Sequence, residues 1–368
     1  MSLPQPSPDA LAHSRLVAEH IQQVIAASGD WISFARYMEL ALYAPGLGYY
    51  SAGAAKLGSQ GDFVTAPEIS SYFGRTLARP IANALRHTGG SILELGAGSG
   101  RLALDILGEL AGRHELPEQY LILEVSADLR ERQRLFLARH APQFLERLVW
   151  LEALPTSFIG VIVANEVLDA LPVHVLHWCD DDVLERGVVA RGDSFAWEMR
   201  SLPDSPLREL ALRLAPGIDY TSEVSLAVPA FVRTIGATLL RGAAFFIDYG
   251  FLRPEYYHAQ RKRGTLMCHY RHHAHDDPFY LPGLQDITAH VDFTSVAEAA
   301  KGAGLQVATY ATQARFLIDS GITDVLAELD PNDAAVYLPA ANKVQRLLSP
   351  AEMGELFKVM VLAKGFAD

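Results

Sequence analysis

The sequence has very few cysteines. Of its 368 residues only Cys179 and Cys268 are cysteines, and they lie far apart and outside any C-x-x-C spacing. A disulfide framework and a thiolate zinc site both require more cysteines at closer spacing, so neither is expected. The cysteine content fits a reducing compartment.

Long apolar runs and excess positive charge are also missing. No segment approaches the roughly 18 apolar residues of a membrane span, and the first residues have neither a signal-peptide core nor an arginine-rich transit pattern. The net charge is −12, whereas a nucleic-acid backbone requires a basic surface. We therefore expect a cytoplasmic protein with no membrane insertion and no nucleic-acid partner. No sequence feature defines an oligomeric state.

Regular alternation of strand and helix patterns begins at residue 91. Apolar segments at 91–95, 120–125, 148–152 and 160–165 are separated by helical spacing, which predicts a parallel sheet with helical crossovers. β-rich runs with Asp and Gly turns follow and predict antiparallel hairpins inserted into this α/β fold. Helical spacing before residue 88 predicts an N-terminal helical cap.

Three glycines at alternate positions, Gly96, Gly98 and Gly100, follow the first of these strands and open a helix. A dinucleotide fingerprint places its third glycine three positions after the second, to admit a pyrophosphate at the helix N-terminus. The G-x-G-x-G spacing and the preceding acid Glu94 disfavour a phosphate, and therefore a nicotinamide-dependent dehydrogenase. A plain strand-to-helix turn is the structural alternative.

A second acid, Glu124, ends the next strand. A carboxylate at this place can accept hydrogen bonds from both ribose hydroxyls of an adenosine, and such charge-assisted bonds contribute about 1.5 to 3 kcal/mol each. A ligand with an adenosine, a positive centre and no phosphate satisfies the glycines and both acids. The sequence predicts S-adenosylmethionine as cofactor.

Acids and an amide gather at two later strand ends. Asn165, Glu166 and Asp169 follow the strand at 160–165, where they face the ligand crevice of a parallel sheet. Two carboxylates and an amide at this place could bind and orient a substrate, so we assign catalytic roles to Asn165, Glu166 and Asp169. The alternative is a helix-capping Asn with two solvated acids. Asp248 and Tyr249 end a further strand and either contact the substrate or support the loop.

Histidines cluster in residues 268–277, with Arg271 among them. The candidate metal ligands there are His269, His272, His273 and His275. Their crowded spacing and the nearby positive charge disfavour metal binding. We predict no metal site and interpret this segment as a polar loop that contacts the substrate.

Several motifs together resemble one family. They are ELGAGSGRL, YLILEVSADLRERQ, GDFVTAPEIS, VIVANEVLDALPV, FFIDYGF and LPGLQDITAHVDFTSV. In this order they resemble the MidA family of methyltransferases, which includes a mitochondrial assembly factor that methylates an arginine of a respiratory NADH dehydrogenase subunit. The resemblance implies a Rossmann-like, doubly wound class I methyltransferase core over 89–368. It places the three glycines and Glu124 around the cofactor, and we add Glu94 from its position before the loop. We expect an insertion at about 173–223 and substrate-side loops at about 250–293.

The resemblance also implies that residues 61–68 fold over the cofactor as part of a cap at 1–88. A small-residue loop with Gly61, Asp62, Phe63, Thr65 and Glu68 suits this role, because it can cover a polar cation and exclude water. Thr65 and Glu68 also have the spacing of a helix capping box, and we expect both roles.

The predicted function is transfer of a methyl group from S-adenosylmethionine to an arginine of a protein substrate. A subunit of the respiratory NADH dehydrogenase is one candidate substrate. Another protein residue, a small molecule, or a non-catalytic assembly factor that binds the cofactor are the alternatives.

Overall fold

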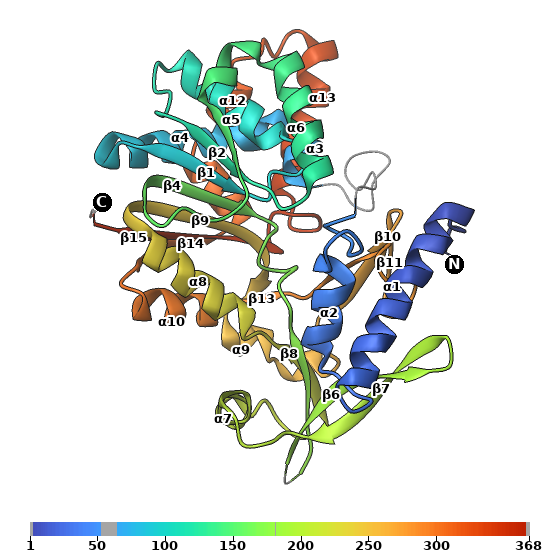
Figure 1. The fold of residues 1–368 in the computed structure, drawn as a ribbon. Helices are drawn as coiled ribbons and strands as arrows, with labels where there is room; N and C mark the ends of the chain where they lie inside the picture. Colours follow the sequence, from blue (N-terminus) through green and yellow to red (C-terminus); the bar gives the residue numbers. More distant parts are fainter. Residues whose placement is uncertain (1–2, 53–64, 181, 366–368) are drawn as a thin grey trace.

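The computed structural model describes residues 3–52, 65–180 and 182–365 (Figure 1). Within them, a central eight-stranded sheet has the order β14-β15-β9-β4-β1-β2-β3, with β13 beside β9. Its strands are β1 (Ser91–Leu95), β2 (Tyr120–Leu123), β3 (Leu148–Leu151), β4 (Phe158–Asn165), β9 (Leu239–Phe251), β13 (Val291–Asp292), β14 (Gln306–Thr312) and β15 (Phe357–Lys364). The pairs from β3 to β9 are parallel, and β15 and β14 are antiparallel. The predicted doubly wound α/β core is confirmed.

Alternation along the strands builds a core on each face of the sheet. In β4, Val161 and Val163 pack on one face, and Ile162 and Ala164 on the other. Figure 1 shows helices on both faces. One face carries α4 (Ser71–Thr88), α5 (Arg101–Gly112), α6 (Ala127–His140), α11 (Gln313–Asp319), α12 (Ile322–Leu326) and α13 (Ala334–Leu348), and the other carries α8 (Ala227–Thr238) and α10 (Phe293–Gly302). Because both faces are covered, the strands read as almost continuous apolar runs.

The N-terminal helices and the inserted strands form a second region, the peripheral module. It contains α1 (Pro8–Ala27), α2 (Phe34–Tyr43), the sheet β7 (Ser194–Ser201), β6 (Val183–Arg191), β5 (His174–Trp178), β8 (Tyr220–Val224), and the small sheet β11 (His273–His275), β10 (Met267–Tyr270), β12 (Asp286–Thr288). Phe34, Val188 and Ile287 share one apolar cluster across these elements. The predicted antiparallel hairpins are confirmed, and they pack against the N-terminal helices.

One glycine makes this packing possible. A Cβ at Gly187 of β6 would lie 2.2 Å from the Trp31 ring and 2.4 Å from the Ile32 carbonyl oxygen. The bare backbone therefore lets the chain before α2 lie directly on the inserted sheet, where Ile32 and Val188 form a β-bridge.

Helix α4 packs on the central sheet, although residues 1–88 were predicted to form an N-terminal cap. Phe73 and Leu77 on this helix pack into the core against α5 and the sheet. The boundary at residue 88 stays a prediction, but this helix covers the central sheet.

The remaining elements connect these layers. They are α3 (Ala66–Ile69), η1 (Pro142–Arg147), α7 (Pro206–Leu214), α9 (Arg253–Tyr256) and η2 (Ala259–Arg261). Among the helices described, none combines the length and the apolar character needed to cross a bilayer.

Candidate active site

A cavity lies where the carboxyl ends of β1, β2 and β4 meet the start of the peripheral module. This is the crevice in which open α/β sheets bind ligands. We call one part the glycine end, lined by Glu94, Gly96, Gly98, Glu124 and Val125. We call the other part the acid end, lined by Asn165, Glu166, Tyr43, Tyr49 and Tyr50.

The glycine loop has three left-handed residues, but only two line the cavity. The φ angles are +66° at Gly96, +55° at Gly98 and +83° at Gly100. A Cβ at Gly100 would instead meet the Leu137 side chain at 3.5 Å. The prediction that Gly100 contacts the cofactor therefore needs correction, because its α-carbon faces α6 and its left-handed conformation starts α5.

Glu94 is buried beneath this loop. One of its oxygens accepts a hydrogen bond from the Tyr120 hydroxyl at 2.7 Å. The Glu94 pKa is raised to about 7, mainly by burial; the hydrogen bond from Tyr120 opposes this shift and the nearby Glu124 adds to it. A cationic ligand at the glycine end would favour the charged carboxylate.

Glu124 is held by hydrogen bonds on both oxygens. One accepts from the Ser126 amide at 3.0 Å, and the other from Gln133 Nε2 at 3.2 Å. The same amide nitrogen of Gln133 donates to the Gly98 carbonyl at 3.0 Å. Gln133 thus joins the adenosine-binding candidate Glu124 to the glycine loop.

The sequence analysis did not predict Gln133. It lies on α6, where it is fully buried four residues before the buried Leu137. Most residues of α6 are charged or polar, and Gln133 lies one helical turn before the apolar Leu137, on the same face. A polar residue on the buried face of such a helix is the signal that could have identified it.

An apolar surface at the glycine end is uncovered. Val125, directly after Glu124, lines the cavity with 63% of its surface exposed, next to Leu129. An apolar wall beside a fixed carboxylate and a bare backbone fits a nucleoside, whose base covers the wall while its sugar reaches the acid. These residues therefore fit the predicted S-adenosylmethionine.

Glu68 contacts the glycine loop instead of completing a capping box. Thr65 is the N-cap of α3, but its side chain caps no backbone amide. The Glu68 carboxylate accepts a hydrogen bond from the Ser99 hydroxyl. Thr65 and Glu68 both line the cavity. The predicted capping box is wrong, because the Glu68 side chain bonds to Ser99 of the glycine loop and not to the start of its own helix. Gly61, Asp62 and Phe63 lie outside the described residues.

At the acid end, Glu166 has an unusual backbone. Its φ is +53°, and its amide donates to the Ile247 carbonyl at 2.8 Å. Its carboxylate accepts from Asn165 Nδ2 at 3.1 Å and from the Ala66 amide. Burial, with the neighbouring Asp169, raises the Glu166 pKa to about 8. Left-handed non-glycine residues are uncommon and concentrate at functional sites.

Asn165 also faces the cavity, and its buried Oδ1 has no hydrogen-bond partner within the described part of the chain. An unsatisfied buried acceptor costs free energy unless a ligand donates to it. Asn165 and Glu166 thus place hydrogen-bond acceptor atoms at the cavity, an arrangement that suits a ligand with several N–H groups.

Asp169, Asp248 and Tyr249 lie behind the cavity wall. Asp169 is 5% exposed and accepts a hydrogen bond from the Tyr249 hydroxyl. Asp248 is 1% exposed, and its oxygens accept from the amides of Leu168, Asp169 and Tyr249. None of the three lines the cavity in the described residues. The substrate-contact prediction for Asp248 needs correction, because its oxygens hold the loop after β4.

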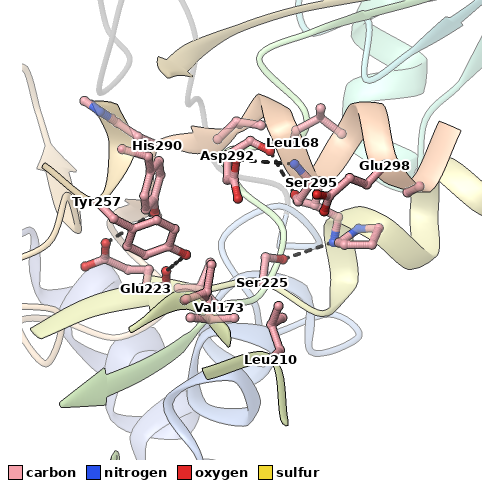
Figure 2. Close-up of a pocket in the computed structure, with 18 of the residues that line it drawn as sticks. Leu168, Val173, Leu210, Glu223, Ser225, Tyr257, His290, Asp292, Ser295 and Glu298 are labelled. Atoms are coloured by element: carbon pink, nitrogen blue, oxygen red, sulfur yellow. Dashed lines mark hydrogen bonds between the residues drawn. The ribbon is translucent and has the colours of Figure 1, made fainter. Parts of the chain in front are cut away.

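Figure 2 shows a second cavity, on the other side of the chain after β4. Its carboxylates are used in the fold. Glu223 accepts from the Thr265 amide at 2.9 Å, Asp292 caps α10, and Glu298 binds Arg253. Because these acids already have partners, we place the chemistry in the first cavity.

The histidine segment lies apart from both ends. His272, His273 and His275 line a third pocket with Leu3 and Tyr280, which shares no residue with the active-site cavity. Over residues 3–52, 65–180 and 182–365 no group of three or more His, Cys, Asp or Glu side chains has an arrangement that could hold a metal ion. A substrate contact by this segment stays a prediction.

Comparison with known proteins agrees with this geometry. The profile of a family of S-adenosyl-L-methionine-dependent methyltransferases matches residues 76–311. The chain belongs to this family. A protein from Burkholderia thailandensis, solved bound to S-adenosyl-homocysteine, is 51% identical with a TM-score of 0.97, over 100% of this chain and 96% of that one. The product of the cofactor is therefore bound by a protein with the same fold.

Curated relatives are more distant. The mitochondrial protein arginine methyltransferase NDUFAF7 of Danio rerio is 29% identical over 94% of this chain and 86% of its own. The Drosophila melanogaster homologue, also mitochondrial, is 29% identical over 98% and 88%. These findings confirm the predicted methyltransferase fold, enzyme class and cofactor.

The predicted cytoplasmic location is wrong by the same comparison, because the curated relatives are named as mitochondrial proteins. Cellular location depends on short segments read by receptors. The composition of a folded domain does not determine it.

Proposed function

We propose that the enzyme methylates the guanidinium of an arginine in a protein substrate. The observation that carries this proposal is the pair of hydrogen-bond acceptors at the acid end, the Glu166 carboxylate and Asn165 Oδ1, which has no partner among the residues that the structure describes. A guanidinium has five N–H donors in a planar fork and matches two adjacent acceptors better than an ammonium does.

The acid end would act by orientation and charge. S-adenosylmethionine, when bound, supplies a methyl group on a positive sulfur. Glu166 and Asn165 would accept hydrogen bonds from one edge of the guanidinium and leave another nitrogen free to face the glycine end. Asp169, one layer deeper, would add negative charge without direct contact, since burial raises its pKa only to about 6.

The names of the relatives support the same acceptor. The proteins from Danio rerio and Drosophila melanogaster are named protein arginine methyltransferases. The MidA family, which the sequence resembles, includes an assembly factor that acts on a respiratory NADH dehydrogenase subunit. We therefore propose such a subunit as the first protein to test.

Methyl-label transfer tests this function. The purified enzyme is incubated with methyl-labelled S-adenosylmethionine and a lysate, and the labelled polypeptides are identified by mass spectrometry. We expect the label on an arginine nitrogen of a protein. Label on lysine, on another residue or only on small molecules would replace this function with the corresponding alternative.

A non-catalytic role is tested by a matched measurement. Binding of S-adenosylmethionine and S-adenosyl-homocysteine is measured by calorimetry on the same preparation. Binding of both without any label transfer would indicate an assembly factor that no longer turns over.

A further inference from the structure

Two tyrosines of the peripheral module face the acid end of the cavity. Tyr43 ends α2 and Tyr50 follows seven residues later, and both line the cavity with Glu166. Their rings stack on each other, with centroids 5.4 Å apart and an interplanar angle of 25°. The Tyr49 ring meets Tyr50 edge-on at 5.0 Å. The acid end therefore has an aromatic wall, formed by Tyr43, Tyr49 and Tyr50, in the same cavity as Asn165 and Glu166.

Hydrogen bonds hold the two rings in place. The Tyr43 hydroxyl donates to the Ala170 carbonyl at 3.0 Å, in the chain that follows Glu166. The Tyr50 hydroxyl donates to Asp286 Oδ1 at 2.8 Å, on β12. Tyr43 is thus fixed to the chain that follows β4, the segment that also carries Glu166, and Tyr50 is fixed to β12.

Charge and burial keep these hydroxyls as donors. Burial raises the pKa of Tyr43 and of Tyr50, and the nearby Asp286 raises both further. Asp286 is 3% exposed and also contributes to the raised pKa of Glu166. Asp286 therefore influences the pKa values of Tyr43 and Tyr50 in the aromatic wall and of Glu166.

We propose that Tyr43 and Tyr50 select the side chain that receives the methyl group. Tyr50 is held by Asp286, and the two rings give a planar cation a fixed aromatic surface in the cavity that Glu166 also lines. A guanidinium can lie flat on an aromatic ring while its edge binds a carboxylate, whereas an ammonium is a compact and strongly hydrated charge. This inference rests on the proposed arginine acceptor. It adds that the peripheral module contributes to the selectivity for arginine, beside the core residues Asn165 and Glu166.

The test uses the full-length enzyme and a peptide spanning the arginine labelled in the lysate. The KM of this peptide is compared with the inhibition constant of the same peptide carrying lysine at that position. For Tyr50→Leu we expect the KM for the arginine peptide to rise about 10-fold and the preference over lysine to be largely lost. Tyr50→Phe, which keeps the ring but not its bond to Asp286, should have a smaller effect in the same direction.

Tyr37→Phe is the matched control. Tyr37 lies on α2, is fully buried and donates to the Pro278 carbonyl at 2.8 Å, but it does not line the cavity. The Tyr37→Phe enzyme should lose thermal stability but keep the KM for the arginine peptide and the inhibition constant of the lysine peptide. Affinity for S-adenosyl-homocysteine should stay unchanged in every variant.

The outcomes separate this inference from the proposed function. If the wild-type enzyme labels no arginine, the proposed function fails, and the inference with it. If it does, while folded Tyr50→Leu keeps the wild-type KM and preference, only the inference is overturned. A parallel loss of S-adenosyl-homocysteine affinity would also overturn it, because the wall would then belong to the cofactor.

Discussion

The two ends of the cavity differ in where their residues come from. The residues that define the glycine end come from one stretch, 94–125, in which strand, loop and helix follow each other directly, with Glu68 added from α3. The acid end collects Tyr43, Asn165 and Glu166 from separate segments, with Asp286 behind them. The comparison teaches that the proposed cofactor site depends mainly on local structure of the core, whereas the proposed site for the methyl-accepting arginine requires the contact between core and peripheral module.

The ends also differ in how their acids are satisfied. Glu124 accepts hydrogen bonds on both oxygens, from the Ser126 amide and from Gln133. Glu166 has Asp169 and Asp286 as neighbours, and its pKa is raised to about 8. The Glu124 carboxylate therefore has its hydrogen bonds before a ligand binds, whereas the charged form of Glu166 is disfavoured by burial and would be stabilised by a bound cation.

Gly98→Val should abolish cofactor binding, the largest effect expected. A β-branched residue at a φ of +55° is strained, and Gly98 lines the cavity, so the substitution should distort the glycine end. S-adenosyl-homocysteine affinity is measured by calorimetry. Gly192→Val has the same backbone strain at φ +57° in a hairpin with open space around it, and should change affinity by no more than about twofold. Retained affinity in Gly98→Val would mean that the cofactor lies elsewhere.

Glu166→Gln should separate the two ends. We expect kcat to fall by roughly 100-fold or more, the usual cost of losing one group that stabilises the transition state, with S-adenosyl-homocysteine affinity unchanged. Glu298→Gln in the second cavity is the matched control and should keep full turnover. Wild-type kcat in Glu166→Gln would remove this residue from the proposed mechanism.

Glu124→Gln should show the opposite pattern. Weaker hydrogen bonds to the ribose should lower cofactor affinity by about 10- to 100-fold, which corresponds to 1.5 to 3 kcal/mol. At saturating cofactor, kcat should stay close to wild type. Glu152→Gln changes an exposed acid paired with Arg130 one strand away and should leave affinity unaltered. Equal losses in both variants would contradict the role of Glu124.

The smallest effect concerns stability. The Glu166 pKa is about 8 in the folded protein and near 4.5 when unfolded, so the folded state binds more protons between these values. Stability should therefore fall as pH rises from about 4.5 to 8. Glu166→Gln removes this loss. Its Tm should exceed that of wild type at pH 9 by about 2 °C or more and match it near pH 5. A constant Tm difference across pH would mean that the carboxyl group is not shifted.

The sequence allowed most of the glycine end to be predicted. Gly96, Gly98, Glu94 and Glu124 line the cavity as expected, because strand ends and loop glycines are placed by local geometry. Gly100 was misplaced, since the spacing of glycines cannot distinguish a ligand contact from a packing contact with α6. The cofactor followed from the same local pattern.

The acid end was predicted only in part. Asn165 and Glu166 were identified from the end of β4, but the sequence pattern could not separate them from Asp248, whose oxygens bind backbone amides. The sequence analysis did not identify Tyr43 or Tyr50 as site residues. Nothing in their spacing connects them to β12.

By itself, then, the amino-acid sequence determined the α/β core, the strand ends that carry the site, and the nucleoside cofactor. These depend on periodicity, glycine backbone freedom and carboxylate position within short stretches. Only the tertiary structure decided which acids face the cavity and which support the fold, and that Tyr50 reaches Asp286. The reason is that such contacts depend on how distant segments dock, and docking is set by packing over the whole core.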